Sequence, residues 1–175
     1  MMGKTRVILF VLCVTLAVIL IAGPAIGNGD AAAPVPPATI LAGGVVYEAE
    51  DAAIGQGVVE TEHAGYTGAG YVNNKNIVGS YVEWTVSAAS AGDYTLLFRY
   101  GNGGGATRFC DVIVNGTKVA NVGFDSPGPV YPDDWRVWLI KTMKITLRQG
   151  KNTIGAVSTV VDGPPNWDRI EIAKL

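Results

Sequence analysis

From Val45 onward, short runs in which apolar and polar residues alternate are separated by turns rich in glycine, asparagine and aspartate. Successive side chains of a strand point to opposite faces, so alternation predicts a strand with one buried face. In the clearest run, residues 81–86, Val82, Trp84 and Val86 share one face. This part of the chain lacks the sustained periodicity of an amphipathic helix. The pattern predicts an all-β fold, an antiparallel β-sandwich of the jelly-roll type.

Two hairpins are expected within this fold. Asn115-Gly116 stands between the strand-like runs 111–114 and 117–120, and this dipeptide favours a two-residue turn because both positions need positive φ. A second hairpin is predicted where the runs 144–147 and 153–157 flank a polar turn.

The closing strand combines inward and outward residues. Ile170 and Ile172 are predicted to face the core together with Asp168, since they share one parity. Trp167 has the opposite parity and is expected to face outward or into a neighbouring loop. Trp84 and Trp138 are predicted to be core residues.

The first 44 residues are predicted to lie outside the folded module. Residues 1–27 contain basic residues, an apolar run and then small residues, the order typical of a secretory signal peptide. Residues 28–44 are rich in proline and alanine, which indicates a linker. The module is then 45–175. We expect the protein to be secreted or displayed at the cell surface, with the membrane as a partner only if the signal peptide is retained as an anchor.

Charge and cysteine content narrow the function classes. The formal net charge is −2, which argues against nucleic acid as a partner, because such partners select basic surfaces. Once the signal peptide is removed, Cys110 is the only cysteine, so no internal disulfide can form. Cys110 is expected to be a buried apolar residue rather than a nucleophile, because His63, the only histidine, lies in a polar stretch typical of a surface.

Three carboxylates suggest a metal site. Glu48 and Glu50 accompany the opening strand, and Asp168 stands at the head of the closing strand. Buried carboxylates need a partner, and no lysine or arginine is an evident partner for all three. Hard oxygen ligands gathered from distant parts of a chain are typical of Ca²⁺, so we expect a structural Ca²⁺ that ties the first strand to the last.

Several short segments occur in the order found in carbohydrate-binding modules of families 6 and 35, which this chain resembles from about Val45 to Leu175. The matching segments are 47–51, 70–72, 82–84, 92–94, 99–103, 114–116, Trp135, Trp138, 150–152 and 165–168. The resemblance implies a galactose-binding-like β-sandwich without catalytic activity. It also implies a Ca²⁺ held by Glu48, Glu50 and Asp168, with backbone carbonyls of the 68–71 loop as further ligands.

The resemblance also implies a saccharide cleft in the loops at one end of the sandwich. In this chain the cleft maps onto Tyr71, Trp135 and Asn166; aromatic rings stack on the apolar face of a pyranose, and amides pair with its hydroxyl groups. Beyond the family pattern, Asn73 follows Tyr71 in an amide-rich loop, and Asn102 and Arg108 flank a glycine loop. Arg108 is a candidate to bind the carboxylate of a uronic acid, because a guanidinium pairs well with a carboxylate.

The expected function is binding of a plant or microbial polysaccharide, including polysaccharides that contain uronic acids. The alternative is a structural or adhesive surface domain that has lost the saccharide site. A hydrolase is disfavoured, because the chain has no Ser/His/Asp set and no evident facing carboxylate pair. A separately encoded glycoside hydrolase is a further candidate partner. A second Ca²⁺ in the ligand site remains open.

Overall fold

The computed structural model describes residues 41–128 and 134–175. Within these residues the chain forms eleven β-strands and no helix, which confirms the all-β prediction. The strands are β1 (Val45–Glu48), β2 (Ala53–Gly55), β3 (Gly57–Glu60), β4 (Tyr71–Asn74), β5 (Tyr81–Ala88), β6 (Gly92–Gly101), β7 (Arg108–Val114), β8 (Thr117–Phe124), β9 (Trp138–Leu147), β10 (Gly150–Ser158) and β11 (Asn166–Lys174). The predicted signal peptide and most of the predicted linker fall outside the described residues.

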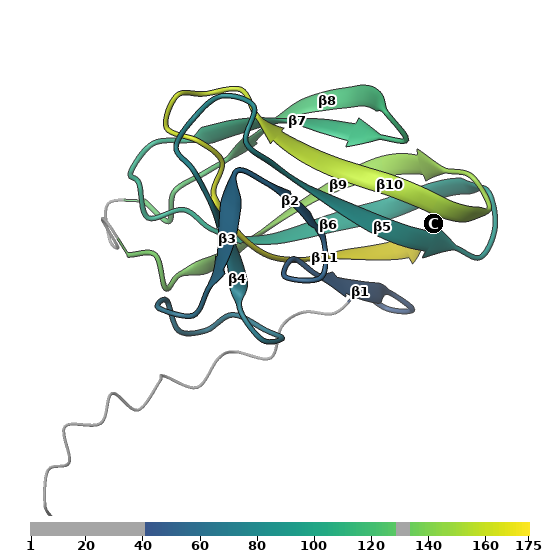
Figure 1. The fold of residues 1–175 in the computed structure, drawn as a ribbon. Helices are drawn as coiled ribbons and strands as arrows, with labels where there is room; N and C mark the ends of the chain where they lie inside the picture. The colour runs from purple at the N-terminus through teal and green to yellow at the C-terminus, as the bar shows by residue number, and fades with distance from the viewer. Residues whose placement is uncertain (1–40, 129–133) are drawn as a thin grey trace, which may run out of the picture. The chain divides into compact units, whose positions relative to one another are not determined.

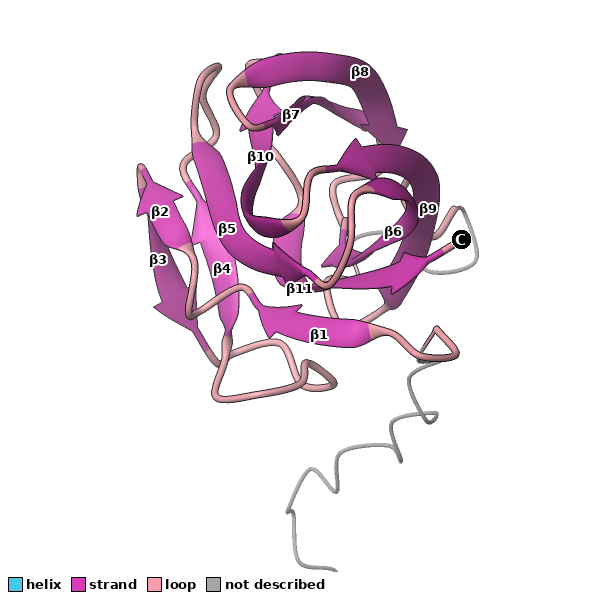
Figure 2. Ribbon diagram, turned by 90° about the vertical axis from the view of Figure 1, so that its right-hand side faces the viewer, coloured by secondary structure: helices cyan, strands magenta, loops and turns pink. Residues whose placement is uncertain are grey.

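The strands form two antiparallel sheets that pack face to face (Figures 1 and 2). One sheet has the order β3-β4-β11-β6-β9, with β1 also paired to β11, and the other has the order β2-β5-β10-β7-β8. The closing strand β11 therefore lies inside its sheet, between β6 on one side and β1 and β4 on the other. The predicted pairing of the opening and closing strands is confirmed, with Val45 opposite Ile172 and Glu48 opposite Arg169.

Of the two predicted hairpins, one is confirmed and one is wrong. β7 and β8 pair directly, and Asn115 and Gly116 both have positive φ, at 50° and 78°. β9 and β10 do not pair with each other: β9 pairs with β6, and β10 pairs with β5 and β7. The connection after Leu147 therefore crosses from one sheet to the other. Local alternation identified both strands but could not show that they belong to different layers.

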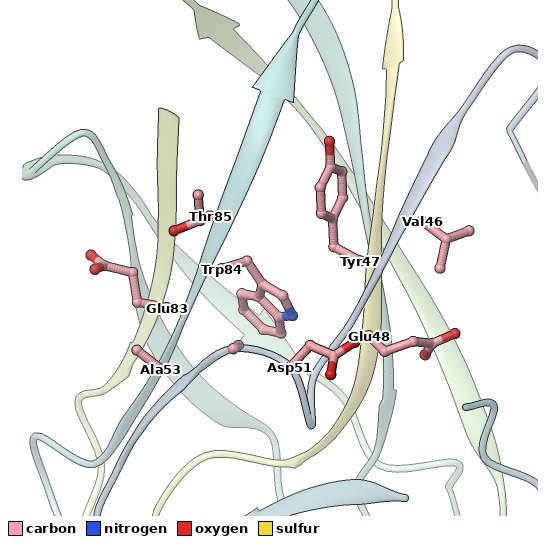
Figure 3. A pocket seen from close by; sticks show the side chains of 9 residues that line it. Val46, Tyr47, Glu48, Asp51, Ala53, Glu83, Trp84 and Thr85 are labelled. Atoms are coloured by element: carbon pink, nitrogen blue, oxygen red, sulfur yellow. The ribbon is translucent and has the colours of Figure 1, made fainter. Parts of the chain in front are cut away.

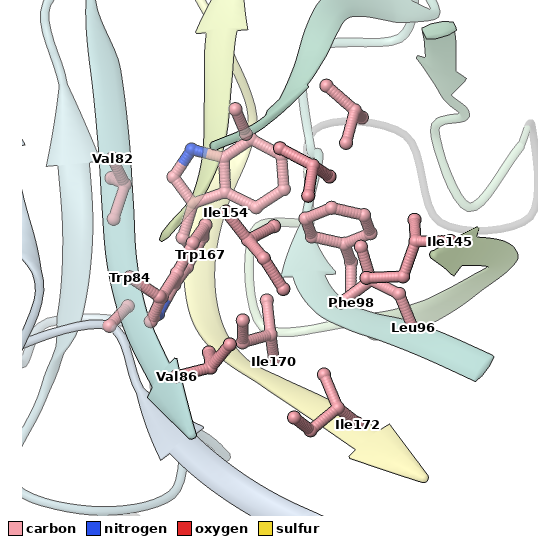
Figure 4. Packing of buried hydrophobic residues seen from close by; sticks show 14 of the residues in the cluster. Val82, Trp84, Val86, Leu96, Phe98, Ile145, Ile154, Trp167, Ile170 and Ile172 are labelled. Atoms are coloured by element: carbon pink, nitrogen blue, oxygen red, sulfur yellow. The ribbon is translucent and has the colours of Figure 1, made fainter. Parts of the chain in front are cut away.

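The core lies between the sheets and is built from the inward faces of both (Figure 4). Trp84, Phe98 and Trp167 pack there with their rings tilted or edge-on, at centroid separations of 5.7–6.2 Å. Ile170 and Ile172 face the same core, as predicted. Cys110 is also fully buried, and burial raises the pKa of its thiol, so this side chain is inert packing as predicted.

The predicted outward orientation of Trp167 is wrong, because its side chain is fully buried in the core. The register of β11 against β6 shifts between Trp167 and Arg169. Such a bulge adds one residue and reverses the parity of the strand. Trp167 and Ile170 consequently share the inward face, while Asp168 meets Arg99 outside the apolar core.

Candidate functional site

The three predicted metal ligands gather around one loop, which connects β3 to β4. Thr67 of this loop donates its backbone N–H to Asp168 Oδ1 over 2.6 Å and its hydroxyl to Glu48 Oε2 over 2.9 Å. The backbone N–H of Ala69 donates to Glu50 Oε1. A loop residue between these donors, Gly68, has a φ of 66° and leaves no room for a side chain beside the Glu50 carboxylate. The loop and the carboxylates thus form one packed unit.

Part of the negative charge is compensated by arginine. Arg99 of β6 forms a buried ion pair with Asp168 Oδ2 and donates a second hydrogen bond to the carbonyl of Gly65 over 2.8 Å. No lysine or arginine was expected to serve all three carboxylates, and Arg99 is the ion-pair partner of Asp168 alone. The sequence did not show that β6 lies beside the head of β11. Glu48 and Glu50 form no ion pair in the described part of the chain.

The other two carboxylates, Glu48 and Glu50, have no basic ion-pair partner among the described residues to compensate their charge. Burial raises the pKa of Glu48, and the nearby charges of Asp168 and Glu50 add to this effect, against a hydrogen bond from Thr67. Glu50 Oε2 is buried without a hydrogen-bond partner. The described residues contain no group of three or more His, Cys, Asp or Glu side chains already in metal-binding geometry. The oxygen-only donor set with one unpartnered buried atom nevertheless fits a hard cation such as Ca²⁺.

The predicted aromatic residues lie together next to this unit. Tyr71 is fully buried, and its ring contacts Trp138 edge-on at a centroid distance of 5.4 Å. Trp138 is half-buried and donates its indole N–H to the carbonyl of Ala64 over 3.1 Å. The prediction that Trp138 belongs to the core is wrong, because it packs on the outer side of its sheet, over Arg99.

Trp135 is half-buried, and its ring is covered on two sides. The Arg108 guanidinium lies 5.0 Å from the ring centroid, a cation–π contact. His63 stacks on the ring at a centroid distance of 6.2 Å. His63 is therefore not the simple surface residue that its polar sequence context predicts.

Two predicted polar residues hold the loops in place. Arg108 is mostly buried, and its Nη1 donates to the carbonyls of Asp162 and Pro164 and to the side chain of Asn76. This guanidinium therefore joins two loops, one between β4 and β5 and one between β10 and β11, to the start of β7. Asn102 is fully buried, and its amide bonds to the carbonyls of Ala106 and Phe124, which closes the glycine loop.

The other two predicted amides have unused hydrogen-bonding capacity. Asn73 donates to Glu60 Oε2 over 3.0 Å, and the same oxygen accepts the hydroxyl of Tyr71. Asn166 is only 3% exposed, yet its side-chain amide has no hydrogen bond to the described residues. Asn166 pairs with Gly101, and the backbone of Trp135 packs on that glycine. Trp135 and Asn166 thus border the same point of the fold, and Asn166 is the amide that a ligand could satisfy.

Four residues of this region were not predicted as site residues from the sequence: Glu60, His63, Thr67 and Arg99. The loop 61–70 contains three glycines and two aromatic side chains. From this composition, tight turns and ring contacts in the loop could have been predicted. Which carboxylate each loop residue meets depends on the pairing of β3, β4 and β11, which alternation does not reveal.

A pocket of about 260 Å³ opens between β1 and β5, lined by residues that include Tyr47, Glu48 and Trp84 (Figure 3). No predicted saccharide residue lines it. In the described ranges 41–128 and 134–175, no helix has the length and apolar character needed to cross a membrane.

Comparison with known proteins points to one family. The model of the carbohydrate binding module (family 35) matches residues 45–173. An exo-beta-D-glucosaminidase of Amycolatopsis orientalis is 48% identical over 129 residues, which is 73% of this chain but 12% of that enzyme. A family 35 module of Clostridium thermocellum is 42% identical with a TM-score of 0.70, over 75% of this chain and 98% of that one. Xyl-CBM35, solved with a disaccharide that contains glucuronic acid, is 30% identical with a TM-score of 0.65, over 74% and 93% of the two chains.

Proposed function

The chain belongs to family 35 of the carbohydrate-binding modules, and we propose that its folded domain binds plant or microbial polysaccharide without catalysing a reaction. The proposed site is the end of the sandwich where Trp135 and Asn166 border Gly101. The observation that carries this placement is Asn166, whose side-chain amide has no hydrogen bond to the described residues and is not among their fully buried polar atoms, beside a half-buried indole. An amide that faces solvent with its donors and acceptor unused is available to a ligand hydroxyl, which it can meet as donor or acceptor.

The remaining predicted residues take supporting roles in this proposal. Asn73, with Glu60, offers hydrogen-bonding groups next to Tyr71. Arg108 and Asn102 shape the loops, because their bonds are mostly internal. A uronic acid is included among the proposed ligands, since the relative solved with a glucuronic acid disaccharide has the same fold. The edge of the Arg108 guanidinium opposite Nη1 is the proposed partner of the carboxylate of the uronic acid.

The proposal includes a structural Ca²⁺. Glu48, Glu50 and Asp168 would hold it, with carbonyls of the 68–71 loop. Its charge would offset Glu48 and Glu50, which form no ion pair among the described residues, and it would meet the unpartnered Glu50 Oε2. The ion would stiffen the loop that leads into Tyr71. The protein is also proposed to be exported and to act beside a glycoside hydrolase, because the matched glucosaminidase carries the corresponding region as 12% of its length.

Isothermal titration calorimetry tests the binding function. The folded domain in Ca²⁺ buffer is titrated with xylan, mannan, pectic and glucuronic-acid oligosaccharides. We expect a dissociation constant on the order of micromolar to millimolar for at least one of them. Trp135→Ala and Asn166→Ala should each weaken binding at least tenfold, whereas Thr159→Ala, on an exposed position of the same end, should not. No binding by the wild type to any of these sugars would overturn the proposal.

One observation favours the alternative of a structural or adhesive surface domain. Tyr71, predicted to stack on sugar, has no exposed surface. If the domain attaches to cells or matrix equally well with and without Trp135 and Asn166, the alternative holds. Whether a sugar can reach the Tyr71 ring therefore helps to decide between sugar binding and a purely structural role.

A further inference from the structure

One of the rings that cover Tyr71 is the imidazole of His63. The ring of His63 stacks on Tyr71 at a centroid distance of 5.6 Å and an interplanar angle of 22°. It also stacks on Trp135 at 6.2 Å and 19°. His63 thus lies between the two aromatic rings that the proposed function assigns to the sugar, nearly parallel to both.

The other two described rings that contact Tyr71 do not stack on its face. Tyr66 contacts its ring at 5.8 Å with a tilt of 51°, and Trp138 contacts it edge-on. Neither of these two rings is stacked on Tyr71, so among the described side chains only His63 stacks on it. The imidazole therefore occupies the space in which a pyranose ring would stack on Tyr71.

The imidazole is held by ring contacts and by the nearby charge of Asp134 rather than by a hydrogen bond. It makes ring contacts with Tyr71 and Trp135, but no hydrogen bond or ion pair of its side chain occurs among the described residues. His63 belongs to the long loop 61–70 between β3 and β4, and it precedes Gly65, which has a φ of 103°. A change of side-chain rotamer in such a loop requires no break in a strand.

We propose that His63 occupies, in the free domain, the position that a sugar ring takes in the complex. The inference rests on the proposed function and deepens it. Saccharide binding displaces the imidazole, and a flat pyranose face replaces it between Tyr71 and Trp135. His63 then sets the affinity and selects rings whose apolar face is free of axial or bulky substituents, because only these restore both stacking contacts. His63 is a specificity-determining residue, although it does not touch the bound sugar.

The test compares His63→Ala and His63→Phe with the wild type and with Thr61→Ala, an exposed position in the same loop. Each protein is titrated with the best saccharide of the panel above. We expect His63→Ala to lower the dissociation constant about twofold to tenfold, as loss of one competing aromatic contact gives. His63→Phe should raise it, and Thr61→Ala should leave it unchanged. If His63→Ala weakens binding as Trp135→Ala does, His63 is a sugar contact and the inference is wrong.

A measurement without saccharide keeps the two proposals separate. Acrylamide quenching of tryptophan fluorescence should increase in His63→Ala, because Trp135 loses a covering ring while Trp84 and Trp167 stay buried. Unchanged quenching in a folded His63→Ala protein would overturn the inference even if the domain binds sugar. Increased quenching with no saccharide bound by any variant would instead reject the proposed function, and the displacement step with it.

Discussion

Arg99 and Asp168 illustrate how a single buried contact organises the region. Both side chains are at most 6% exposed, and they connect β6 to the head of β11. Asp168 also accepts two hydrogen bonds from Thr67, so the loop 61–70 is fixed to the sheet through the same carboxylate. Removing one partner of such a pair leaves a charge buried without compensation.

We therefore expect Arg99→Met, measured with a chelator present, to lower the free energy of unfolding by about 3–5 kcal/mol. The matched control is Lys141→Met, which breaks the ion pair with Asp125 at a distance of 3.6 Å on the exposed surface. That change should alter stability by no more than about 0.5 kcal/mol. Urea denaturation of both variants gives the comparison, and equal losses would contradict the role assigned to Arg99.

At the scale of elements, the loop between β3 and β4 connects the proposed metal site to the proposed sugar site. Thr67, Gly68 and Ala69 contact the carboxylates, and His63 contacts the aromatic rings. A substitution that shifts residues 67–69 should therefore weaken metal binding even when the sheets remain intact.

Gly68→Ala tests this, with Gly79→Ala as its control. Both glycines have positive φ, at 66° and 86°, so both substitutions carry a backbone strain of about 1 kcal/mol. Only at Gly68 would the new Cβ lie 2.1 Å from Glu50 Oε1; nothing lies within 4 Å of the position at Gly79. Calorimetry with CaCl₂ should show at least tenfold weaker binding for Gly68→Ala alone. Equal affinities in the two variants would separate the loop from the metal.

The same elements show how far the sequence could predict this structure. Alternation located β5, and Asn115-Gly116 located the β7–β8 turn, because both signals are local. The bulge in β11 has no such signal, which is why Trp167 was assigned to the wrong face. His63 was misjudged for a related reason: its ring partners, Tyr71 and Trp135, lie on segments brought together only by the completed sheet.

For the whole molecule, the carboxylates matter because they belong to opposite ends of the chain. Glu48 ends β1, Asp168 lies in β11, and the two strands are paired. An ion bound there is present only in the folded state, so its binding free energy adds to stability.

Ca²⁺ at a hundred times its dissociation constant should therefore stabilise the domain by about 2.7 kcal/mol relative to a chelated sample. For a domain of this size this corresponds to an increase in Tm of roughly 10 °C, measurable by differential scanning calorimetry. Glu50→Gln, which removes one proposed ligand charge, should abolish most of the increase. Identical melting in EDTA and in excess CaCl₂ would remove the structural calcium from the proposal.

The central position of β11 also affects the time at which the protein can fold. Until residues 166–174 have been synthesised, β1, β4 and β6 lack the strand with which they pair. Contacts between segments so distant in sequence form late. Until then the sheet lacks the strand that joins β1 and β4 to β6, so a partly synthesised domain exposes edges that the finished sheet covers.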